Sequence, residues 1–425
     1  MIARRIPKLL AAGLSLSAFT GLSWAPPKGF NYDEANVPPY TLPDPLVDAE
    51  GARVDAAKWE ASRRAEVLDL FREHVYGVQP PPPEGMTWDV YEQSEEALGG
   101  KAIRKQVKLF VSGNDDGPVL DLLLYLPKNA PEPVPVFLGL NFGGNHTTHT
   151  DPAITFNAGW MRKGNGIVDH RATEATRGKA FHRWPVEMIL ERGFGVATMY
   201  CGDIDPDFDD GFENGVHALY PDLQNRGDNF STISAWAWGL SRAMDFLEKD
   251  DDIDHERVAV LGHSRLGKTA LWAGATDERF AMVISNNSGC GGAALARRRF
   301  GETVERINTS FPHWFCENHK KFNGNEDALP VDQHALIALI APRLVYVASA
   351  SEDQWADPHG EFLSAKEGSR VYELLWSEGI PEDAEWPAAG DHLHAEAVGY
   401  HLREGKHDVE EFDWDLFIGF AESRI

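Results

Sequence analysis

The first third of the chain carries apolar residues in strand-like and helix-like patterns. Ile103–Val111 alternates between apolar and polar residues, and Val119–Leu126 is a largely apolar run. With the polar turn between them, these patterns predict antiparallel strands within residues 84–127. Upstream, apolar residues recur at helical spacing over Ala57–Tyr76, which predicts a helix.

From Val134 onward, short apolar runs alternate with helical patterns. This order predicts an α/β fold, in which helices on both faces of a mostly parallel central sheet form a three-layer sandwich and the N-terminal strands are antiparallel. The expected strands are Val134–Leu140, Gly193–Tyr200, Val258–Leu261, Met282–Ser285 and Arg343–Ala350, and the expected helices are Pro185–Glu191, Ser231–Lys249 and Glu411–Glu422.

The N-terminal residues 1–25 have the pattern of a secretory signal peptide. Basic residues come first, Leu9–Leu22 is apolar, and Ser23 and Ala25 are small residues at the positions before a cleavage site. Pro26 disfavours cleavage at that bond and leaves the exact site open. We expect a secreted or periplasmic bacterial protein whose residues 26–425 form a single domain, beginning with a Pro-rich arm over residues 26–50.

Charge and composition limit the kinds of molecule that the protein is expected to bind. The chain has 40 basic and 66 acidic residues, a formal net charge of −26. This charge disfavours binding to nucleic acid and to anionic membrane surfaces, and no later stretch has the length and apolarity of a membrane span. The 43% of apolar residues suffices for a substantial core. We expect a monomer that acts on a neutral or bulky substrate.

The three cysteines are Cys201, Cys290 and Cys316. Because export permits disulfide formation, Cys290 and Cys316, which flank a loop-rich segment, are the expected pair, and Cys201 would then be free. Three unpaired, buried cysteines are the alternative.

The segment Val258–Lys268, VAVLGHSRLGK, joins an apolar strand to a helix through a tight turn that carries Ser264. This layout is typical of the nucleophile elbow of an α/β-hydrolase, in which the turn presents a serine hydroxyl to a cleft. The usual spacing is G-x-S-x-G, but here the second glycine, Gly267, comes one residue late. The alternative is a Gly-rich turn with an incidental serine.

A serine nucleophile needs a histidine base and an orienting carboxylate, which follow it in the order acid then histidine in α/β-hydrolases. Asp353 comes shortly after a late predicted strand and is the preferred acid, with Glu352 and Asp357 as rivals. The alternative for this stretch is a solvated acidic loop or a helix cap before Pro358. His407, in a turn just before the last helix, is the preferred base.

Other histidines and acidic runs are less suited to catalysis. His401 falls within an ordered segment and is expected to pack locally, and the pair His392 and His394 lacks a clear third metal ligand. The acidic run 203–211 resembles a calcium loop without its Gly and Glu. We therefore expect no metal and no organic cofactor.

Two basic residues follow Ser264. Arg265 is adjacent to the nucleophile and can add a positive charge where a developing oxyanion forms, although a salt bridge to a structural acid is the alternative. Lys268 lies one helical turn further on the same face, where it either reaches a substrate oxygen or is solvated. Trp355, in the predicted acid loop, can stack on a sugar ring.

Over roughly Pro39 to Phe420, the chain resembles the glucuronoyl esterases of carbohydrate esterase family 15. The matching motifs are G-x-S-R-x-G-K at 262–268, N-S-G-x-G-G at 287–292, D-Q-W at 353–355 and G-K-H-D at 405–408. The resemblance explains the late glycine and the adjacent arginine. It implies that Ser264 is the nucleophile, His407 the base and Arg265 an oxyanion-stabilising side chain, and that the glucuronate is contacted by Lys268, Glu302 and Trp355.

Two departures from the family pattern place the chain with the bacterial branch. Many members have a glutamate as the triad acid where this chain has Asn287, so the acid role passes to Asp353. Fungal members have a disulfide between cysteines that correspond here to His263 and Asp408, which cannot form one.

The resemblance implies a secreted serine esterase that cleaves the ester between glucuronic acid, or its 4-O-methyl form, on xylan and lignin alcohols. An acetyl- or feruloyl-type carbohydrate esterase is the first alternative. The loss of the carboxylate at Asn287 keeps open a second alternative, a catalytically weak carbohydrate-binding relative.

Overall fold

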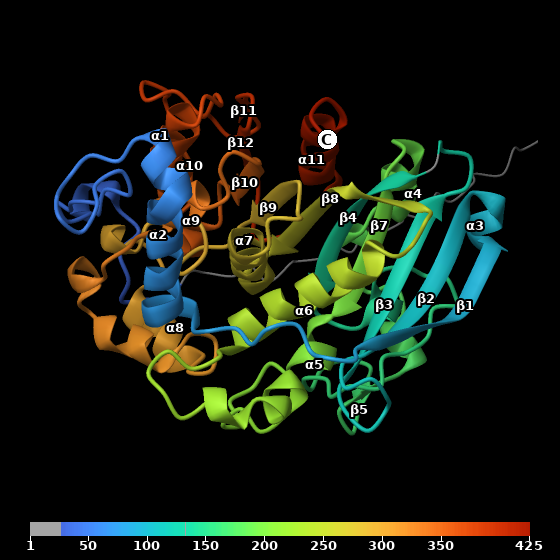
Figure 1. Ribbon diagram of the computed structural model, residues 1–425. Helices are drawn as coiled ribbons and strands as arrows, with labels where there is room; N and C mark the ends of the chain where they lie inside the picture. The colour runs from blue at the N-terminus through green and yellow to red at the C-terminus, as the bar shows by residue number, and fades with distance from the viewer. Residues whose placement is uncertain (1–26, 132) are drawn as a thin grey trace, which may run out of the picture.

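A computed structural model describes residues 27–131 and 133–425 of the chain (Figure 1). In this part of the chain, a ten-stranded sheet has the order β1-β2-β3-β7-β4-β8-β9-β10-β12-β11, and β5 and β6 form a separate hairpin. The strands are β1 Thr87–Glu96, β2 Ala102–Phe110, β3 Val119–Pro127, β4 Val134–Asn141, β5 Ile167–Val168, β6 Arg171–Ala172, β7 Gly195–Tyr200, β8 Ile253–His263, β9 Met282–Asn286, β10 Leu344–Ala350, β11 His392–His394 and β12 Val398–Arg403.

The central strands from β7 to β12 pair in parallel, while β1, β2 and β3 pair antiparallel and join the sheet through β7. The helices are α1 Ala56–Lys58, α2 Arg64–Phe71, α3 Ala97–Gly100, α4 Val186–Glu191, α5 Cys201–Ile204, α6 Thr232–Leu247, α7 Arg265–Thr276, α8 Val304–Ser310, α9 Gln333–Ala338, α10 Pro358–Leu374 and α11 Glu411–Glu422.

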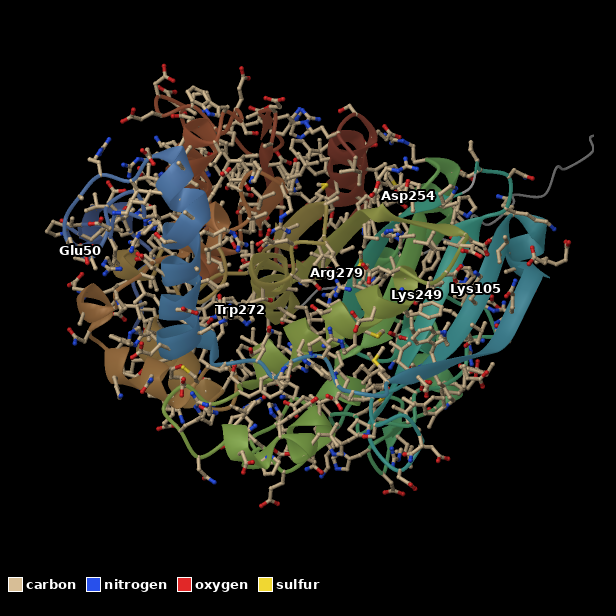
Figure 2. All side chains as sticks on the ribbon, in the orientation of Figure 1. Glu50, Lys105, Lys249, Asp254, Trp272 and Arg279 are labelled. Atoms are coloured by element: carbon tan, nitrogen blue, oxygen red, sulfur yellow. The ribbon has the colours of Figure 1, made fainter. Side chains whose placement is uncertain are left out.

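Two apolar cores, one on each face of the sheet, give the molecule three layers. The larger core packs the sheet against α2, α6, α7, α9 and α10, and the smaller packs it against α4 and α11. The pleat of β8 separates them, because Val258 and Val260 enter the first core while Ala259 and Leu261 enter the second. Trp272 of α7 is fully buried in the larger core (Figure 2). The predicted sandwich is confirmed.

The sequence analysis missed one long element and misjudged the cysteines. The 17-residue helix α10 was not predicted, because its apolar positions are diluted by Gly, Ser and charged residues. The predicted disulfide is wrong, since all three cysteines are free and buried. Cys316 Sγ packs against the Glu73 carbonyl, 3.7 Å away, and the residues between Cys290 and Cys316 fold into a 3₁₀ turn and α8 rather than a loop that closes on itself.

The N-terminal arm makes polar contacts with the rest of the chain. The Arg298 guanidinium donates to Glu34, His334 Nε2 contacts the carbonyl of Pro43, and Arg370 pairs with Asp44. The predicted signal peptide at 1–25 lies outside the described residues. Among residues 27–131 and 133–425, no helix has the length and apolarity needed to cross a membrane.

Candidate active site

Ser264 lies at the sharp turn between β8 and α7. Its backbone has φ 58° and ψ −130°, a conformation that non-glycine residues rarely adopt and that costs about 1–3 kcal/mol. The backbone holds this turn in place, because the N–H of Ser264 donates to the carbonyl of Asn286 on the neighbouring strand, at 2.9 Å. The strained turn directs the hydroxyl away from the sheet, as a nucleophile elbow requires.

The two glycines of the elbow are each required by a close backbone approach. A Cβ on Gly262 would lie 1.9 Å from the carbonyl oxygen of Leu266. A Cβ on Gly267 would lie 2.9 Å from the Ser288 side chain and 3.1 Å from the carbonyl oxygen of Gly262. The second glycine therefore stands where α7 passes the ends of β8 and β9, which accounts for its late position.

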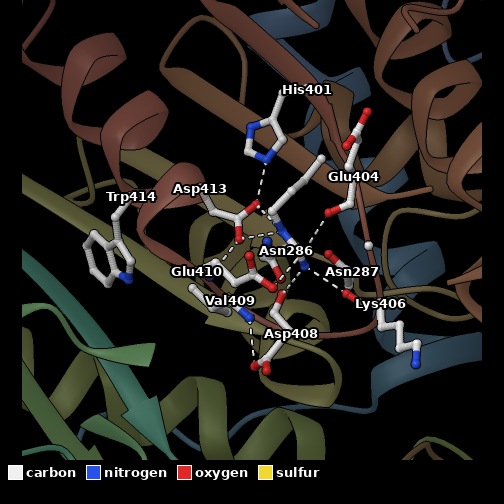
Figure 3. Close-up of polar contacts among 12 residues, drawn as sticks. Asn286, Asn287, His401, Glu404, Lys406, Asp408, Val409, Glu410, Asp413 and Trp414 are labelled. Carbon is white, nitrogen blue, oxygen red and sulfur yellow. Dashed lines mark hydrogen bonds and ion pairs between the residues drawn. The ribbon is translucent and has the colours of Figure 1, made fainter. Parts of the chain in front are cut away.

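His407 lies in the loop between β12 and α11, and Arg403 holds that loop from within. The buried guanidinium donates to the carbonyls of Lys406 and Asp408, on either side of His407, at 2.7 and 3.1 Å. It also pairs with the fully buried Asp413 at 2.9 Å. Figure 3 shows Lys406, Asp408 and Asp413 within one network of polar contacts. His401 packs in this network through a 2.7 Å contact with Asp413, consistent with a local packing role.

Asp353 contacts His407 directly. His407 Nδ1 lies 2.6 Å from Asp353 Oδ2, and the amide of Asn287 donates to the same oxygen at 3.0 Å. Neither rival acid contacts His407. Glu352 is an exposed residue of the cavity wall, and Asp357 caps α10 by accepting from the N–H of Gly360 at 2.9 Å. Asn287, at the position of the usual family acid, thus contacts the carboxylate that faces the imidazole.

Arg265 is the first residue of α7, where a backbone N–H has no partner within the helix and is free for an oxyanion. Its guanidinium lies over the ring of Phe142, 4.5 Å from the centroid. Arg265 Nε lies 3.0 Å from Asp207 Oδ2. The arginine thus forms the salt bridge that was the alternative interpretation, and at the same time lines the cleft.

The Asp207 carboxylate is held in place by contacts with two further side chains. His313 Nε2 and Trp314 Nε1 lie 3.0 and 2.8 Å from its Oδ1. Burial alone would raise the pKa of Asp207, but the hydrogen bond from His313 and the charge of Arg265 hold it below its usual range. The carboxylate therefore stays ionised and holds the Arg265 guanidinium through the ion pair.

Lys268, Glu302 and Trp355 also line the cleft. Lys268 is buried and donates to the carbonyls of Ser288 and Cys290. Burial lowers the pKa of Lys268, and the charge of Glu302 offsets only part of this shift. Burial likewise raises the pKa of Glu302, and the charge of Lys268 offsets only part of that shift. The N–H of Glu302 donates to the Trp355 carbonyl at 3.0 Å, and Phe30 of the N-terminal arm packs edge-on against the Trp355 ring at 4.9 Å.

One cavity of about 810 Å³ brings together every site residue expected from the sequence. Within the described residues, the Ser264 hydroxyl forms no hydrogen bond with His407, a common arrangement before substrate tightens the site. The same residues contain no group of His, Cys, Asp or Glu placed to hold a metal. The cavity is lined by Ser264, Arg265, Lys268, Glu302, Asp353, Trp355 and His407, with Phe311 and Trp314 beside them.

The positions of the fungal disulfide are occupied by polar contacts instead. His263 is buried with its ring 4.4 Å from that of His407, and its Nδ1 lies 2.7 Å from Asn286 Oδ1. Burial and then the neighbouring His407 charge hold the pKa of His263 well below its usual range, so it is neutral. Asp408 pairs with Arg183 at 2.5 Å. This ion pair ties the His407 loop to the segment before α4.

The sequence analysis missed three residues that orient the site: Asn287 as a hydrogen-bond donor, Asp207 and Arg403. A signal existed for Asp207, because it falls in the acidic run 203–211 that resembles a calcium loop. For Arg403 the sequence contained no signal, since its partners are backbone carbonyls that only the folded loop brings around it.

Comparison with known proteins assigns this geometry to a family. Residues 187–376 match the family model described as glucuronyl esterase of fungi. A carbohydrate esterase from an unknown prokaryotic organism is 55% identical over 411 residues, covering 95% of this chain and 94% of that protein. The chain belongs to carbohydrate esterase family 15. As a member of this family it is a carboxylic ester hydrolase, and the family resemblance drawn from its motifs is confirmed.

Solved structures of family 15 members share the fold over nearly the whole chain. One, described as a promiscuous CE15 esterase from a marine bacterial metagenome, is 54% identical with a TM-score of 0.87, covering 93% of this chain and all of that one. A glucuronoyl esterase from Solibacter usitatus is 46% identical with the same TM-score, covering 92% and 99%. More distant is a 4-O-methyl-glucuronoyl methylesterase from Schizophyllum commune, 28% identical over 92% of this chain and 86% of that protein.

Proposed function

We propose that this family 15 esterase hydrolyses the ester between glucuronic acid, or its 4-O-methyl form, on xylan and a lignin alcohol. The observation that carries the proposal is the common cavity. His407, paired with Asp353 at 2.6 Å, lines the same cavity as Ser264 and the three side chains expected to contact the sugar. An esterase that does not act on a uronate would not need Lys268, Glu302 and Trp355, which we call the sugar side of the cavity.

In the proposed reaction, Ser264 Oγ attacks the uronoyl carbonyl carbon and His407 Nε2 accepts the hydroxyl proton. Asp353 orients the imidazole and balances its positive charge. The carbonyl oxygen becomes an oxyanion beside the Arg265 N–H and guanidinium. As the tetrahedral intermediate collapses, His407 returns the proton to the departing alcohol. Water, deprotonated by His407, then attacks the glucuronoyl ester of Ser264 and releases the acid and the serine.

The sugar side of the cavity suits a ring that carries hydroxyls and no free charge. Glu302 accepts hydrogen bonds from hydroxyls, Lys268 donates to an oxygen, and the face of Trp355 packs on sugar C–H groups. The acidic chain repels a free uronate, but the ester form of the substrate is neutral. Electrostatics therefore favour binding the ester and releasing the acid.

A second cavity, of about 390 Å³, adjoins the elbow on the side of His263. Apolar side chains such as Trp184 and Met161 line it, with Arg162 and Lys179 among its polar residues. Its volume and mostly apolar lining are those of a small-molecule site, and it would receive an aromatic alcohol. Export as the cell location is supported by the signal-peptide pattern of residues 1–25.

The direct test compares release of benzyl alcohol from benzyl glucuronate with release of acetate from acetylated xylan. We expect the wild-type chain to cleave the first ester much faster, and S264A to cleave neither. Acetate release without uronate cleavage would instead support an acetyl-type carbohydrate esterase. Inactivity on both esters, with glucuronoxylan still bound, would support the carbohydrate-binding alternative.

A further inference from the structure

Trp376, just past the end of α10, is the most exposed large apolar side chain of the described residues, with 91% of its surface open to solvent. Single exposed apolar residues are common, so exposure alone carries little. The backbone beneath this ring provides the second observation.

Trp376 occupies the position at which a helix ordinarily ends in glycine. Its φ of 64° is left-handed. The N–H of Trp376 donates to the carbonyl of Glu373 at 3.2 Å, and the N–H of Ser377 donates to that of Tyr372 at 2.9 Å. These two bonds define a Schellman ending, in which glycine avoids the steric strain of a side chain. The chain therefore has a bulky ring at a strained backbone position, although the exposed ring gains almost no stabilisation from packing.

The segment that carries the ring is firmly held. The N–H of Ile380 donates to Ser369 Oγ at 2.9 Å, and the N–H of Ala397 donates to the carbonyl of Glu378 at 3.0 Å. Ile380 itself is 1% exposed. The ring is thus presented on an ordered backbone, which reduces the entropic cost of binding to it.

A hollow of about 360 Å³ lies beside the ring, lined by Glu373, Trp376, Ser377, Glu378, Gly379 and Pro381. Its polar groups are carboxylates and a hydroxyl, which accept hydrogen bonds from ligand hydroxyls, and its lining contains no basic residue. An aromatic face between acceptors suits the C–H face and hydroxyls of a neutral sugar. A stable protein interface would instead have several apolar side chains and few acidic ones at its centre.

We propose that Trp376 and this hollow form a second carbohydrate site, which binds the neutral backbone of a xylan-type polysaccharide. The site is separate from the catalytic cavity, because Asp357 caps α10 beside that cavity and Trp376 follows the other end of the helix, roughly 25 Å away for 17 residues. Its benefit to catalysis rests on the proposed function, since holding a polymer raises the effective concentration of esters attached to it.

The test is affinity electrophoresis of the wild-type chain in gels that contain neutral arabinoxylan. This polymer has no glucuronate, so the uronate side of the catalytic cavity is not probed. W376G removes the ring and the strain together, and W376A removes only the ring. W88A is the matched control, because Trp88 is a 40% exposed tryptophan on β1. The kcat/KM of every variant is also measured on benzyl glucuronate.

We expect the arabinoxylan to retard the wild-type chain and W88A equally, and both Trp376 variants to bind about fivefold more weakly or worse. All four proteins should hydrolyse benzyl glucuronate alike. Equal retardation of W376G, or no retardation of the wild-type chain, would overturn the proposal. So would a change in the gel-filtration volume of W376G without a change in retardation, which would mark an interface between copies. Failure of the proposed function would instead appear as an inactive wild-type chain that is still retarded.

Discussion

At the scale of single residues, the carboxylate that faces His407 determines the mechanism. Asp353 contacts the imidazole, and the Asn287 amide donates to the same carboxylate. We propose that Asp353 takes the role that the family resemblance gives to a glutamate at the position of Asn287. A carboxylate held by an amide and an imidazole on one oxygen has little freedom to turn. We infer that this arrangement compensates for the missing glutamate.

Replacing Asp353 by Asn is expected to lower kcat on benzyl glucuronate by about 10³-fold to 10⁴-fold, because the amide favours the wrong imidazole tautomer and cannot balance its charge. The neighbouring E352Q is the matched control and should leave kcat nearly unchanged, since Glu352 lines the cavity without contacting the imidazole. Equal losses in both variants would contradict the assignment of Asp353.

Asp207 is expected to act through Arg265 as a positioning residue. In D207N the guanidinium loses its ionic partner, and we expect kcat to fall about 10-fold to 100-fold with KM little changed, because the oxyanion forms only in the transition state. D209N, in the same acidic run but exposed, should behave as the wild type. Steady-state kinetics separate the two parameters, and a rise in KM at constant kcat would argue for a role in substrate binding.

At the scale of elements, Arg403 holds the β12–α11 loop from within, while the ion pair of Asp408 with Arg183 ties it from outside. Arg403 bonds to carbonyls on both sides of His407 and to Asp413, a set of directions that a planar guanidinium can satisfy and an ammonium cannot. The loop therefore depends on arginine geometry as well as on charge.

R403K keeps the charge and is expected to lower kcat about 10-fold or more through misplacement of His407. The Tm of the same variant should also fall, since the buried partners of Arg403 lose hydrogen bonds. R226K, at an exposed arginine that does not line the cavity, serves as the matched control. Full activity in R403K would show that the loop is held by its other contacts.

At the end of α10, a substitution is expected to stabilise the protein rather than to impair it. Because Trp376 is left-handed and exposed, W376G should raise the free energy of unfolding by about 1 kcal/mol, whereas W376A keeps the unfavourable φ and should not. Urea denaturation of both variants measures the difference. A less stable W376G would mean that the ring packs on the surface after all.

At the scale of the whole molecule, the buried carboxyl of Glu361 is expected to make the free energy of unfolding depend on pH. Burial raises the pKa of Glu361 to about 8, and it contacts Ser349 Oγ at 2.6 Å and the N–H of Gly289 at 2.9 Å. The folded chain thus keeps a proton that the unfolded chain releases near pH 4.5. Linkage then requires that its contribution to stability falls as the pH rises from about 4.5 to about 8.

E361Q cannot titrate, so its free energy of unfolding should fall less than that of the wild type across this pH range. Denaturant unfolding at pH 5, 7 and 8.5 measures the two slopes. E373Q, on an exposed position of the same helix, should keep the wild-type slope. Parallel curves for the wild type and E361Q would contradict the raised pKa.

The sequence by itself determined the layers, the elbow and the candidate site, because hydrophobic period and glycine spacing are local properties of the chain. The strand at Val258 and the helix at Glu411 came directly from such patterns. Tertiary structure decided which acid contacts His407, where the cysteines lie and that Arg265 is held by Asp207. Those outcomes depend on contacts between residues far apart in the chain, such as the 2.6 Å approach of Asp353 to His407. Only the packing of whole elements sets such distances.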